Sequence, residues 1–217
     1  MLFDFERLSA AERYKLLVAT VVPRPIAWVV SQDAAGVVNA APYSFFNVFT
    51  DDPAVVAIGC GPRPAGGEAK DTLANIRATG QFTVCLVPFR LIESMVATAA
   101  DFPPEVDEIA EVGLTHAPSS KVRPPRIAES PVALECETFQ LIPVGHHTIV
   151  LGKVLAMHVA DAAVIDAARC YIDTPALDLV GRMHGRGWYA RTTDRVEVPR
   201  ISAAEWFARK SARGAAE

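Results

Sequence analysis

Short hydrophobic runs rich in valine, isoleucine and phenylalanine dominate the chain, with glycine, proline and aspartate between them. Such runs are typical of β-strands. Because their connections are short, with a loop of hairpin length at 32–36, the pattern predicts a mainly β, antiparallel barrel or sandwich instead of alternating β-α-β units. The predicted strands span 26–31, 37–41, 44–49, 54–60, 82–87, 132–142 and 148–159.

Helical periodicity appears in a few segments beside these strands. Ser9 and Glu12 have the spacing of a capping box, so a short helix is predicted to begin near Ser9 and to end at Pro23. Apolar residues that share one face predict a second helix over 71–80, which ends in a glycine cap, and a third over 90–99. The helices are thus expected to lie around a body of strands.

The segment 101–125 differs from the rest because it is rich in proline and acidic residues. This composition predicts a surface excursion that contains one short acidic helix. Its charges are interpreted as a solvated face and not as a metal site. The last residues, 208–217, are expected to form a frayed helix end.

Composition and charge narrow the function classes. With 217 residues, 51% of them hydrophobic, the chain is expected to form a single domain over 1–217 around one well-buried core. A formal net charge of −4 and a pI near 5.8 argue against a protein that coats nucleic acid or an anionic membrane. No leader pattern and no run of about 18 apolar residues is found, so a soluble, cytoplasmic protein is expected.

Motifs for nucleotides and metals are incomplete. Pro64 occupies the place of the third glycine of a GxGxxG motif, and Gly67 and Glu68 stand where a phosphate loop needs lysine and serine or threonine. The four cysteines form no CxxC pair, and three of them lie in apolar runs typical of a core. His146 and His147, if adjacent on a strand, would point to opposite faces. The sequence therefore predicts neither a Rossmann domain, nor a nucleotide hydrolase, nor a metal site.

Polar residues stand at the start of the second predicted helix. Lys70, Asp71 and Thr72 lie where unpaired backbone N–H groups and the helix dipole favour an anion. A lysine and a threonine hydroxyl there would complete a phosphate cradle. In the alternative interpretation, Asp71 is an N-cap and Lys70 a solvated charge.

Two blocks carry a resemblance to a known family: N-A-A-P-Y-S-F-F at 39–46 and K-D-T-L-A-N-I at 70–76. With the runs around them they resemble the flavin reductase-like family, the FMN-binding split β-barrel proteins that include flavoredoxins and the reductase components of two-component monooxygenases. The resemblance covers residues 20 to about 190 and leaves a tail from about 200. It implies a Greek-key antiparallel split barrel and a homodimer that binds FMN non-covalently near the subunit interface.

Within this resemblance, the interrupted hydrophobic run at 39–46 is interpreted as the flavin seat. A strand broken by Pro42 would leave backbone N–H and C=O groups free to face a ligand. The alternative for Ser44 is a hydroxyl bonded to its own backbone at a bulge. The resemblance implies that Asn39, Ala40, Ala41, Pro42 and Ser44 contact the flavin ring or ribityl chain and that Lys70, Asp71 and Thr72 approach the phosphate.

Two further places match the family less well. At these places the family sequences commonly read Gly-Asp-His and Gly-Glu-Val. His147 matches the family histidine and is expected near the flavin or the incoming nicotinamide. His146 stands in place of the aspartate and Lys153 in place of the glutamate, so both depart from the family patterns. Tyr189 or Trp188, at the end of a glycine-containing segment, is expected to shield the flavin ring. A packing role for either aromatic residue is the alternative.

The resemblance implies an NAD(P)H:flavin oxidoreductase that uses FMN, with NADH or NADPH as donor and free flavin, oxygen, a metal complex or a partner monooxygenase as acceptor. No catalytic acid or nucleophile is expected, because the flavin carries the chemistry. The alternatives are an FMN-binding electron-transfer protein without its own NAD(P)H site and a flavin-binding protein without redox turnover. The hydrophobic runs at 44–49 and 54–60 also favour an obligate dimer with FMN in shared clefts.

Overall fold

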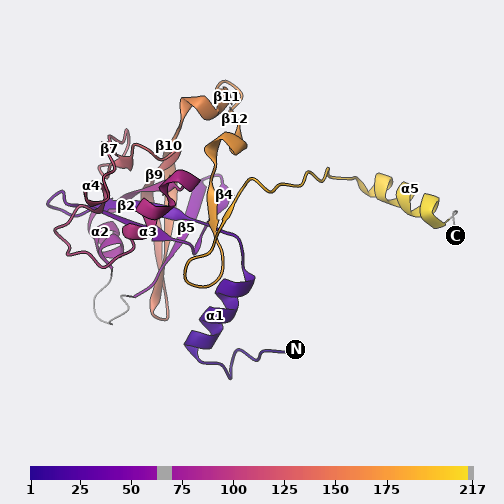
Figure 1. Ribbon diagram of the computed structural model, residues 1–217, viewed down its shortest axis with the longest axis horizontal. Coiled ribbons are helices and arrows are strands. Elements are labelled where there is room, and N and C mark those ends of the chain that lie inside the picture. The colour runs from indigo at the N-terminus through magenta and orange to yellow at the C-terminus, as the bar shows by residue number, and fades with distance from the viewer. Residues whose placement is uncertain (63–69, 215–217) are drawn as a thin grey trace.

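The computed structural model of the chain describes residues 1–62 and 70–214, with side chains described as far as residue 210. Pro64, Gly67 and Glu68 of the incomplete motifs therefore lie outside the described residues, as does the end of the predicted frayed helix at 215–217. Figure 1 shows a body of strands with short helices around it and one further helix, α5 (Ala203–Gly214), at the end of an extended arm. The described residues contain no helix with the length and hydrophobicity that a membrane span requires.

Seven strands form the main sheet, in the order β3-β2-β6-β9-β10-β5-β4, and every neighbouring pair is antiparallel. The predicted strands are confirmed, with their ends moved by at most two residues. The strands are β2 (Ala27–Gln32), β3 (Val38–Tyr43), β4 (Phe46–Asp51), β5 (Ala54–Cys60), β6 (Gln81–Leu86), β9 (Val132–Val144) and β10 (His147–Val159).

The two edges of this sheet are consecutive in the chain. Only Ser44 and Phe45 separate β3 from β4, although the two strands lie at opposite ends of the sheet order. The sheet must therefore curl until its edges approach each other at this crossing, where the Gly59 N–H donates to the Phe45 carbonyl at 2.7 Å. A sheet that curls without β3–β4 pairing is an open, or split, barrel.

The crossing corrects the expected position of the interruption. Pro42 does not break β3, because it pairs with Trp28 of β2, and the strand continues to Tyr43. Proline is tolerated there because β3 is an edge strand, whose outward N–H groups have no ladder partner. The break falls two residues later, at Ser44 and Phe45.

The predicted helices are confirmed, and most of them surround the barrel. The helix α1 (Ala10–Thr20) begins with the predicted capping box of Ser9 and Glu12, but none of its residues is buried. The helix α2 (Asp71–Thr79) ends at Gly80, whose φ of 71° gives the left-handed cap. The other helices are α3 (Ile92–Ala97), preceded by a 3₁₀ turn at Phe89–Leu91, and α4 (Glu108–Glu111) in the acidic excursion.

Shorter elements complete the body. A second sheet places β13 (Val180–Arg182) between β1 (Arg24–Pro25) and β14 (Tyr189–Arg191). The strands β7 (His116–Ala117) and β8 (Arg126–Ile127) form one small pair, β11 (Val164–Asp166) and β12 (Tyr171–Ile172) form another, and 3₁₀ turns lie at Asp161–Ala163 and Thr174–Leu177.

The core has two sides because β2 is buried on both faces. Trp28 and Val30 pack in one cluster with residues of α3 and α4, whereas Ala27 and Val29 pack in the other with residues of α2. This alternation follows from the period of two in a strand. Cys60, Cys85 and Cys136 are buried, as expected from their apolar runs, and Cys170 is exposed.

Gly152 and Phe82 approach each other closely in the core. A Cβ added at Gly152 of β10 would lie 2.4 Å from Cζ of Phe82, which is fully buried on β6. No real Cβ approaches a ring atom so closely, so this position of β10 requires glycine. The ring of Phe82 occupies the space that a side chain at 152 would need.

A buried carboxylate fixes the acidic excursion to the sheet. Glu135 of β9 is fully buried, and its oxygens accept from the N–H groups of Ser120, Lys121 and Val122. The ring Nε2 of His158 on β10 contacts the same carboxylate. Although burial alone would raise the pKa of Glu135, the hydrogen bonds from the Ser120 N–H and from His158 outweigh it and hold this pKa below its usual value.

Two expectations about exposed segments need correction. The runs at 44–49 and 54–60 are both expected to form an apolar face too hydrophobic to expose to water, but only β4 is exposed, whereas β5 is largely buried inside the protein. His146 does not lie on a strand with His147, because it forms the turn between β9 and β10 together with Gly145. Lys153, which departs from the family pattern, pairs across strands with Glu137 at 3.2 Å on the surface.

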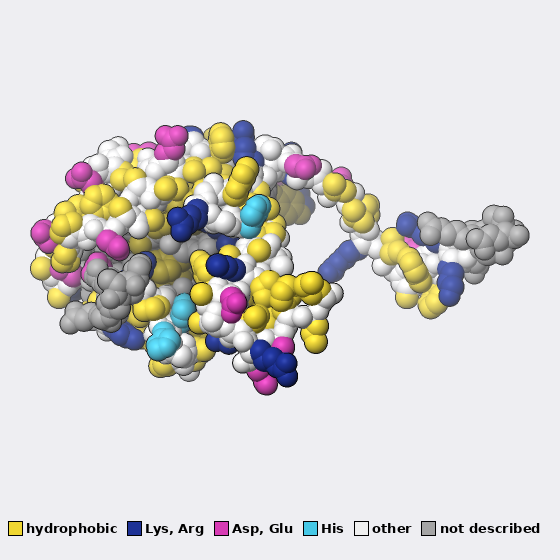
Figure 2. All heavy atoms as spheres, turned by 60° about the horizontal axis from the view of Figure 1, so that its bottom comes forward, with side chains coloured by type: hydrophobic (Ala, Val, Ile, Leu, Met, Phe, Trp, Pro, Cys, Tyr) yellow, Lys and Arg dark blue, Asp and Glu magenta, His cyan; other side chains and the backbone are white. Residues whose placement is uncertain are grey.

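The C-terminal arm leaves the body after β14. From residue 192 onward the described side chains are exposed, including Val196, Val198, Trp206 and Phe207. Figure 2 shows hydrophobic side chains on the surface of this arm, at the right of the view. The extent of the single domain, with its core at about 20–190, stays a prediction.

Candidate functional site

A cleft lies where β3 meets the N-terminal end of α2 and the segment after α3. One pocket, open to solvent, lies at the α2 end, and a second pocket adjoins it toward β14. Pro42, Tyr43 and Ala99 line both pockets, so we treat them as one cleft. The first is also lined by Asn39, Ala41, Lys70, Asp71, Thr72, Thr98, Ala100, Asp101, Phe102 and Glu108, and the second by Ile26, Ser44, Met95, Arg182 and Tyr189.

The segment that closes one side of the cleft is held by the core. The indole N–H of Trp28 donates to the Thr98 hydroxyl at 2.9 Å, and this hydroxyl donates to the Met95 carbonyl at the end of α3. Because Trp28 and Thr98 are both buried, these bonds fix the beginning of the segment that runs to Phe102.

A hydrogen-bonded chain crosses the α2 end of the cleft. The Thr72 hydroxyl donates to Oδ1 of Asn39 at 2.8 Å, and Nδ2 of Asn39 donates to Oε1 of Glu108 at 2.7 Å. Oε2 of Glu108 accepts from the Ala40 N–H at 2.9 Å. Glu108 is buried, so desolvation raises its pKa, although the hydrogen bonds from Ala40 and Asn39 counteract that effect.

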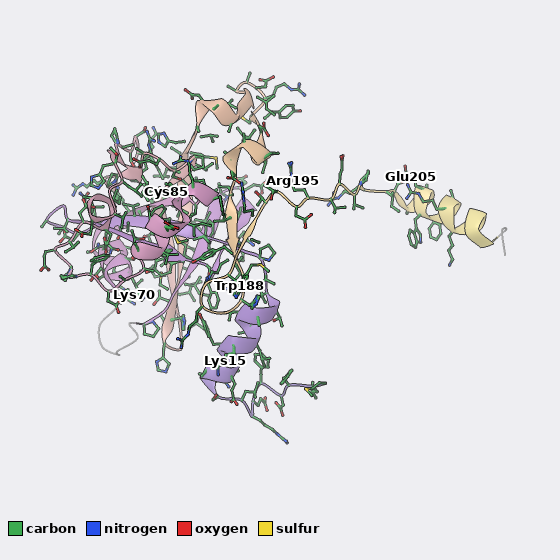
Figure 3. All side chains as sticks on the ribbon, in the orientation of Figure 1. Lys15, Lys70, Cys85, Trp188, Arg195 and Glu205 are labelled. Carbon is green, nitrogen blue, oxygen red and sulfur yellow. The ribbon has the colours of Figure 1, made fainter. Side chains whose placement is uncertain are left out.

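Lys70 supplies positive charge at this end of the cleft. It occupies the N-cap position of α2, and Asp71 is the first residue of the helix, so Asp71 is not the N-cap. Within the described part of the chain, the Lys70 ammonium group forms no hydrogen bond or ion pair. The helix dipole adds positive potential at the same place, and together they favour an anion. Figure 3 shows Lys70 at the margin of the body beside α2.

The other end of the cleft combines aromatic and cationic side chains. Tyr189 is half-buried, and the guanidinium carbon of Arg182 lies 4.8 Å from the centre of its ring. The Ser44 hydroxyl accepts from Nε of Arg24 at 3.4 Å, a partner other than its own backbone. Arg24 is buried and also donates to the carbonyls of Val18 and Val21, so it joins the end of α1 to the cleft.

Most of the predicted site residues thus lie together, and a few do not. Asn39, Ala41, Pro42, Ser44, Lys70, Asp71, Thr72 and Tyr189 line the cleft. Ala40 lies outside its lining, because its side chain packs in the core. His147 is exposed at the start of β10, where its Nε2 would lie 3.0 Å from a Cβ added at Gly61. Contacts of all these residues with a flavin stay predictions.

Of the two aromatic residues considered at 188–189, only Tyr189 lines the cleft. Trp188 is 65% exposed and stacks on His184, with ring centres 6.0 Å apart. Figure 3 shows Trp188 on the loop at the α1 side of the body, whereas Lys70 lies beside α2.

Sequence reasoning missed three charged residues of the site. Glu108 was placed on a solvated acidic face, but its side chain is buried and bonded to β3. Arg24 and Arg182 were not singled out, although both reach the Ser44 and Tyr189 end. The one available signal was the position of Arg24 between two prolines after a helix, where a basic side chain can bond the last helical carbonyls. No group of three or more potential metal ligands is found among the described residues.

Comparison with known proteins gives a family for this arrangement. Residues 19–177 match the sequence profile described as the flavin reductase like domain. An uncharacterised protein of Deinococcus radiodurans is 45% identical over 208 residues, which are 94% of this chain and 91% of the relative.

Two solved structures are similar in both fold and sequence. Nitrilotriacetate monooxygenase component B of Bacillus cereus superposes with a TM-score of 0.85 at 28% identity, over 91% of this chain and 98% of its own. The 2-nitrobenzoate 2-nitroreductase of Pseudomonas fluorescens superposes with a TM-score of 0.84 at 33% identity, over 94% of this chain and 98% of its own. The predicted split-barrel fold is confirmed. The chain therefore belongs to the flavin reductase-like family.

Proposed function

We propose that this protein is an FMN-binding oxidoreductase that takes electrons from NADH or NADPH and passes them to an acceptor. The observation that carries the proposal is the cleft between β3 and α2. Its α2 end presents the Lys70 ammonium group and a helix N-terminus, and its other end presents Ser44 and Tyr189. A ligand with a phosphate at one end and a planar ring system at the other suits this arrangement.

The residues present fit FMN. Lys70 and the first turn of α2 would hold the terminal phosphate, and Ala41 and Pro42 would lie along the middle of the ligand. Ser44 and Tyr189 would hold the ring system. FMN, when bound, supplies the redox chemistry, so the chain needs only to bind it, orient it and leave one side open to a donor and an acceptor.

The electron donor is tested by mixing FMN-loaded protein with NADH or NADPH in a stopped-flow instrument. We expect rapid loss of the visible flavin absorption with at least one of the two nucleotides, faster than with free FMN under the same conditions. No acceleration with either nucleotide would contradict the reductase proposal. It would favour the alternative, an electron-transfer protein that receives electrons from another protein.

The acceptor is proposed from the relatives. The Bacillus cereus relative is named as one component of a monooxygenase, and the Pseudomonas fluorescens relative is named as a nitroreductase. A partner oxygenase that uses reduced flavin, or a small oxidised molecule that enters the open cleft, is therefore the acceptor class that we propose.

Homodimerisation is the second part of the proposal. An apolar surface lies over α1 and the start of β4, where the ring centres of Tyr14 and Phe45 are 6.3 Å apart. Apolar surfaces of this kind usually mark an interface, and Phe45 adjoins Ser44 of the cleft, so a second copy seated there would lie beside the bound flavin. This α1/β4 surface comprises Tyr14, Leu17, Val21 and Phe45, all of which are exposed, and Val48 and Phe49 are exposed further along β4.

Sedimentation over a dilution series, with and without FMN, tests the shared cleft. If both chains contribute to the site, FMN stabilises the dimer by mass action, and the dimer should persist to lower protein concentration when FMN is present. A stable monomer that binds FMN tightly would show that each chain builds its own site.

A further inference from the structure

A buried carboxylate accepts hydrogen bonds from the edge of the barrel at β3. As the outermost strand of the sheet, β3 has N–H groups that point away from β2 and find no ladder partner. Glu108 reaches this edge from α4, with one oxygen on the Ala40 N–H and the other on the Asn39 amide. Because both oxygens accept, the geometry is that of an ionised carboxylate held by two donors.

This carboxylate determines which way the Asn39 amide faces. An acceptor at Glu108 selects the Nδ2 group of Asn39, and the carbonyl oxygen Oδ1 is then left to face Thr72. Thr72 is 1% exposed, so its hydroxyl would be left without this acceptor if the amide turned over. The orientation of Asn39 therefore follows from Glu108, with a weaker contribution from the Ser31 hydroxyl, which donates to the same Oδ1 at 3.5 Å, and Asn39 in turn accepts from Thr72.

The chain of hydrogen bonds from Glu108 ends at the place where an anion is expected. Thr72 is the second residue of α2, directly after Asp71 and Lys70, and the chain of bonds joins this helix end to the edge strand across the cleft. We infer that Glu108 is a positioning residue of the phosphate end of the cleft: by orienting Asn39 and Thr72 it holds the start of α2 against β3. This inference rests on the proposed binding of FMN and names a residue that controls it.

The test exchanges donor and acceptor along the chain of bonds. In Glu108→Gln, the single remaining side-chain oxygen cannot accept from both the Ala40 N–H and the Asn39 amide. The new NH₂ group then faces one of these donors, so that two donors meet without an acceptor. Adding Asn39→Asp restores the pattern, because a carboxylate at 39 accepts from the amide at 108 and from the Thr72 hydroxyl. The double variant has the same formal net charge as the wild type. The matched control is Glu111→Gln, on the exposed side of the same helix.

The readout is the ratio of FMN to riboflavin affinity, measured by titration of flavin fluorescence, since only FMN reaches the phosphate end. We expect Glu108→Gln to lower the ratio by about tenfold, the double variant to return it to within about threefold of wild type, and Glu111→Gln to leave it unchanged. Thermal melting of each variant shows whether the chain is folded. A packing role alone would weaken FMN and riboflavin equally.

The inference is overturned if folded Glu108→Gln keeps the wild-type ratio, or if the double variant shows no recovery. A wild-type protein that binds flavin but does not prefer FMN to riboflavin would remove the phosphate site itself, and the inference with it. A protein that binds no flavin would instead contradict the proposed function. The three results differ in wild-type behaviour, so they are distinguishable.

Discussion

Replacing Glu135 with alanine should lower the free energy of unfolding by about 3 to 5 kcal/mol, the range for breaking a buried, hydrogen-bonded charged group. The substitution leaves the N–H groups of Ser120, Lys121 and Val122 without their acceptor and empties a fully buried position in β9. Urea unfolding at pH 7 measures the change.

A matched control lies two residues away on the same strand. Glu137 is half-exposed and pairs with Lys153 at the surface, so Glu137→Ala should cost less than about 1 kcal/mol. Equal losses for the two variants would contradict the view that Glu135 holds the excursion to the sheet.

The same carboxylate predicts an acid dependence with a definite sign. Because the pKa of Glu135 is lowered in the folded protein, its contribution to stability is complete above the unfolded value of about 4.3 and is lost as the pH falls below it. The stability difference between wild type and Glu135→Gln should therefore be largest near pH 7 and should shrink as the pH is lowered through 4. A difference independent of pH over this range would exclude an ionised Glu135 in the folded state.

Replacing Lys70 with alanine should weaken FMN binding by about 10- to 100-fold and leave riboflavin binding nearly unchanged, on the scale of a charge-assisted hydrogen bond. The expected loss is large because Lys70 is the only basic side chain among the described residues that line the α2 end of the cleft. Without it, the charged side chains there are those of Asp71, Asp101 and Glu108, which repel a phosphate.

Fluorescence titration with both ligands measures this effect. Lys153→Ala is the matched control, since Lys153 pairs with Glu137 on the surface and does not line the cleft. An equal loss for FMN and riboflavin in Lys70→Ala would mean that the fold had changed. No loss for either ligand would place the phosphate elsewhere.

The strands and most helices could be predicted because their signals are local. Alternation, capping residues and turn residues lie within a few positions of each other, as at Ser9 and Glu12 or at Gly80. The sequence predicts the break at Pro42, two residues before the observed break at Ser44 and Phe45, because proline usually interrupts a strand. In an edge strand it need not do so, and edge position depends on the whole sheet.

Residues that come together only in the folded chain were harder to predict. Glu108 is 69 residues from Asn39 and sits among other acidic residues, so its sequence context resembles that of a solvated face. Local sequence does not show that β3 passes beside α4, where the Ala40 N–H and the Asn39 amide need an acceptor. The difference between the exposed β4 and the buried β5 was hard to predict for the same reason. Both strands are hydrophobic, and only their positions in the sheet order distinguish them.

The contact between Gly152 and Phe82 makes the allowed identity of one residue conditional on another. A side chain at 152 can be accommodated only after the ring at 82 has been replaced by something smaller, so the two positions should covary as sequences diverge. Gly145, with φ of 57° and nothing within 4 Å of an added Cβ, is constrained by conformation alone and can drift to asparagine independently. The order of substitutions at 82 and 152 therefore decides which evolutionary paths stay folded.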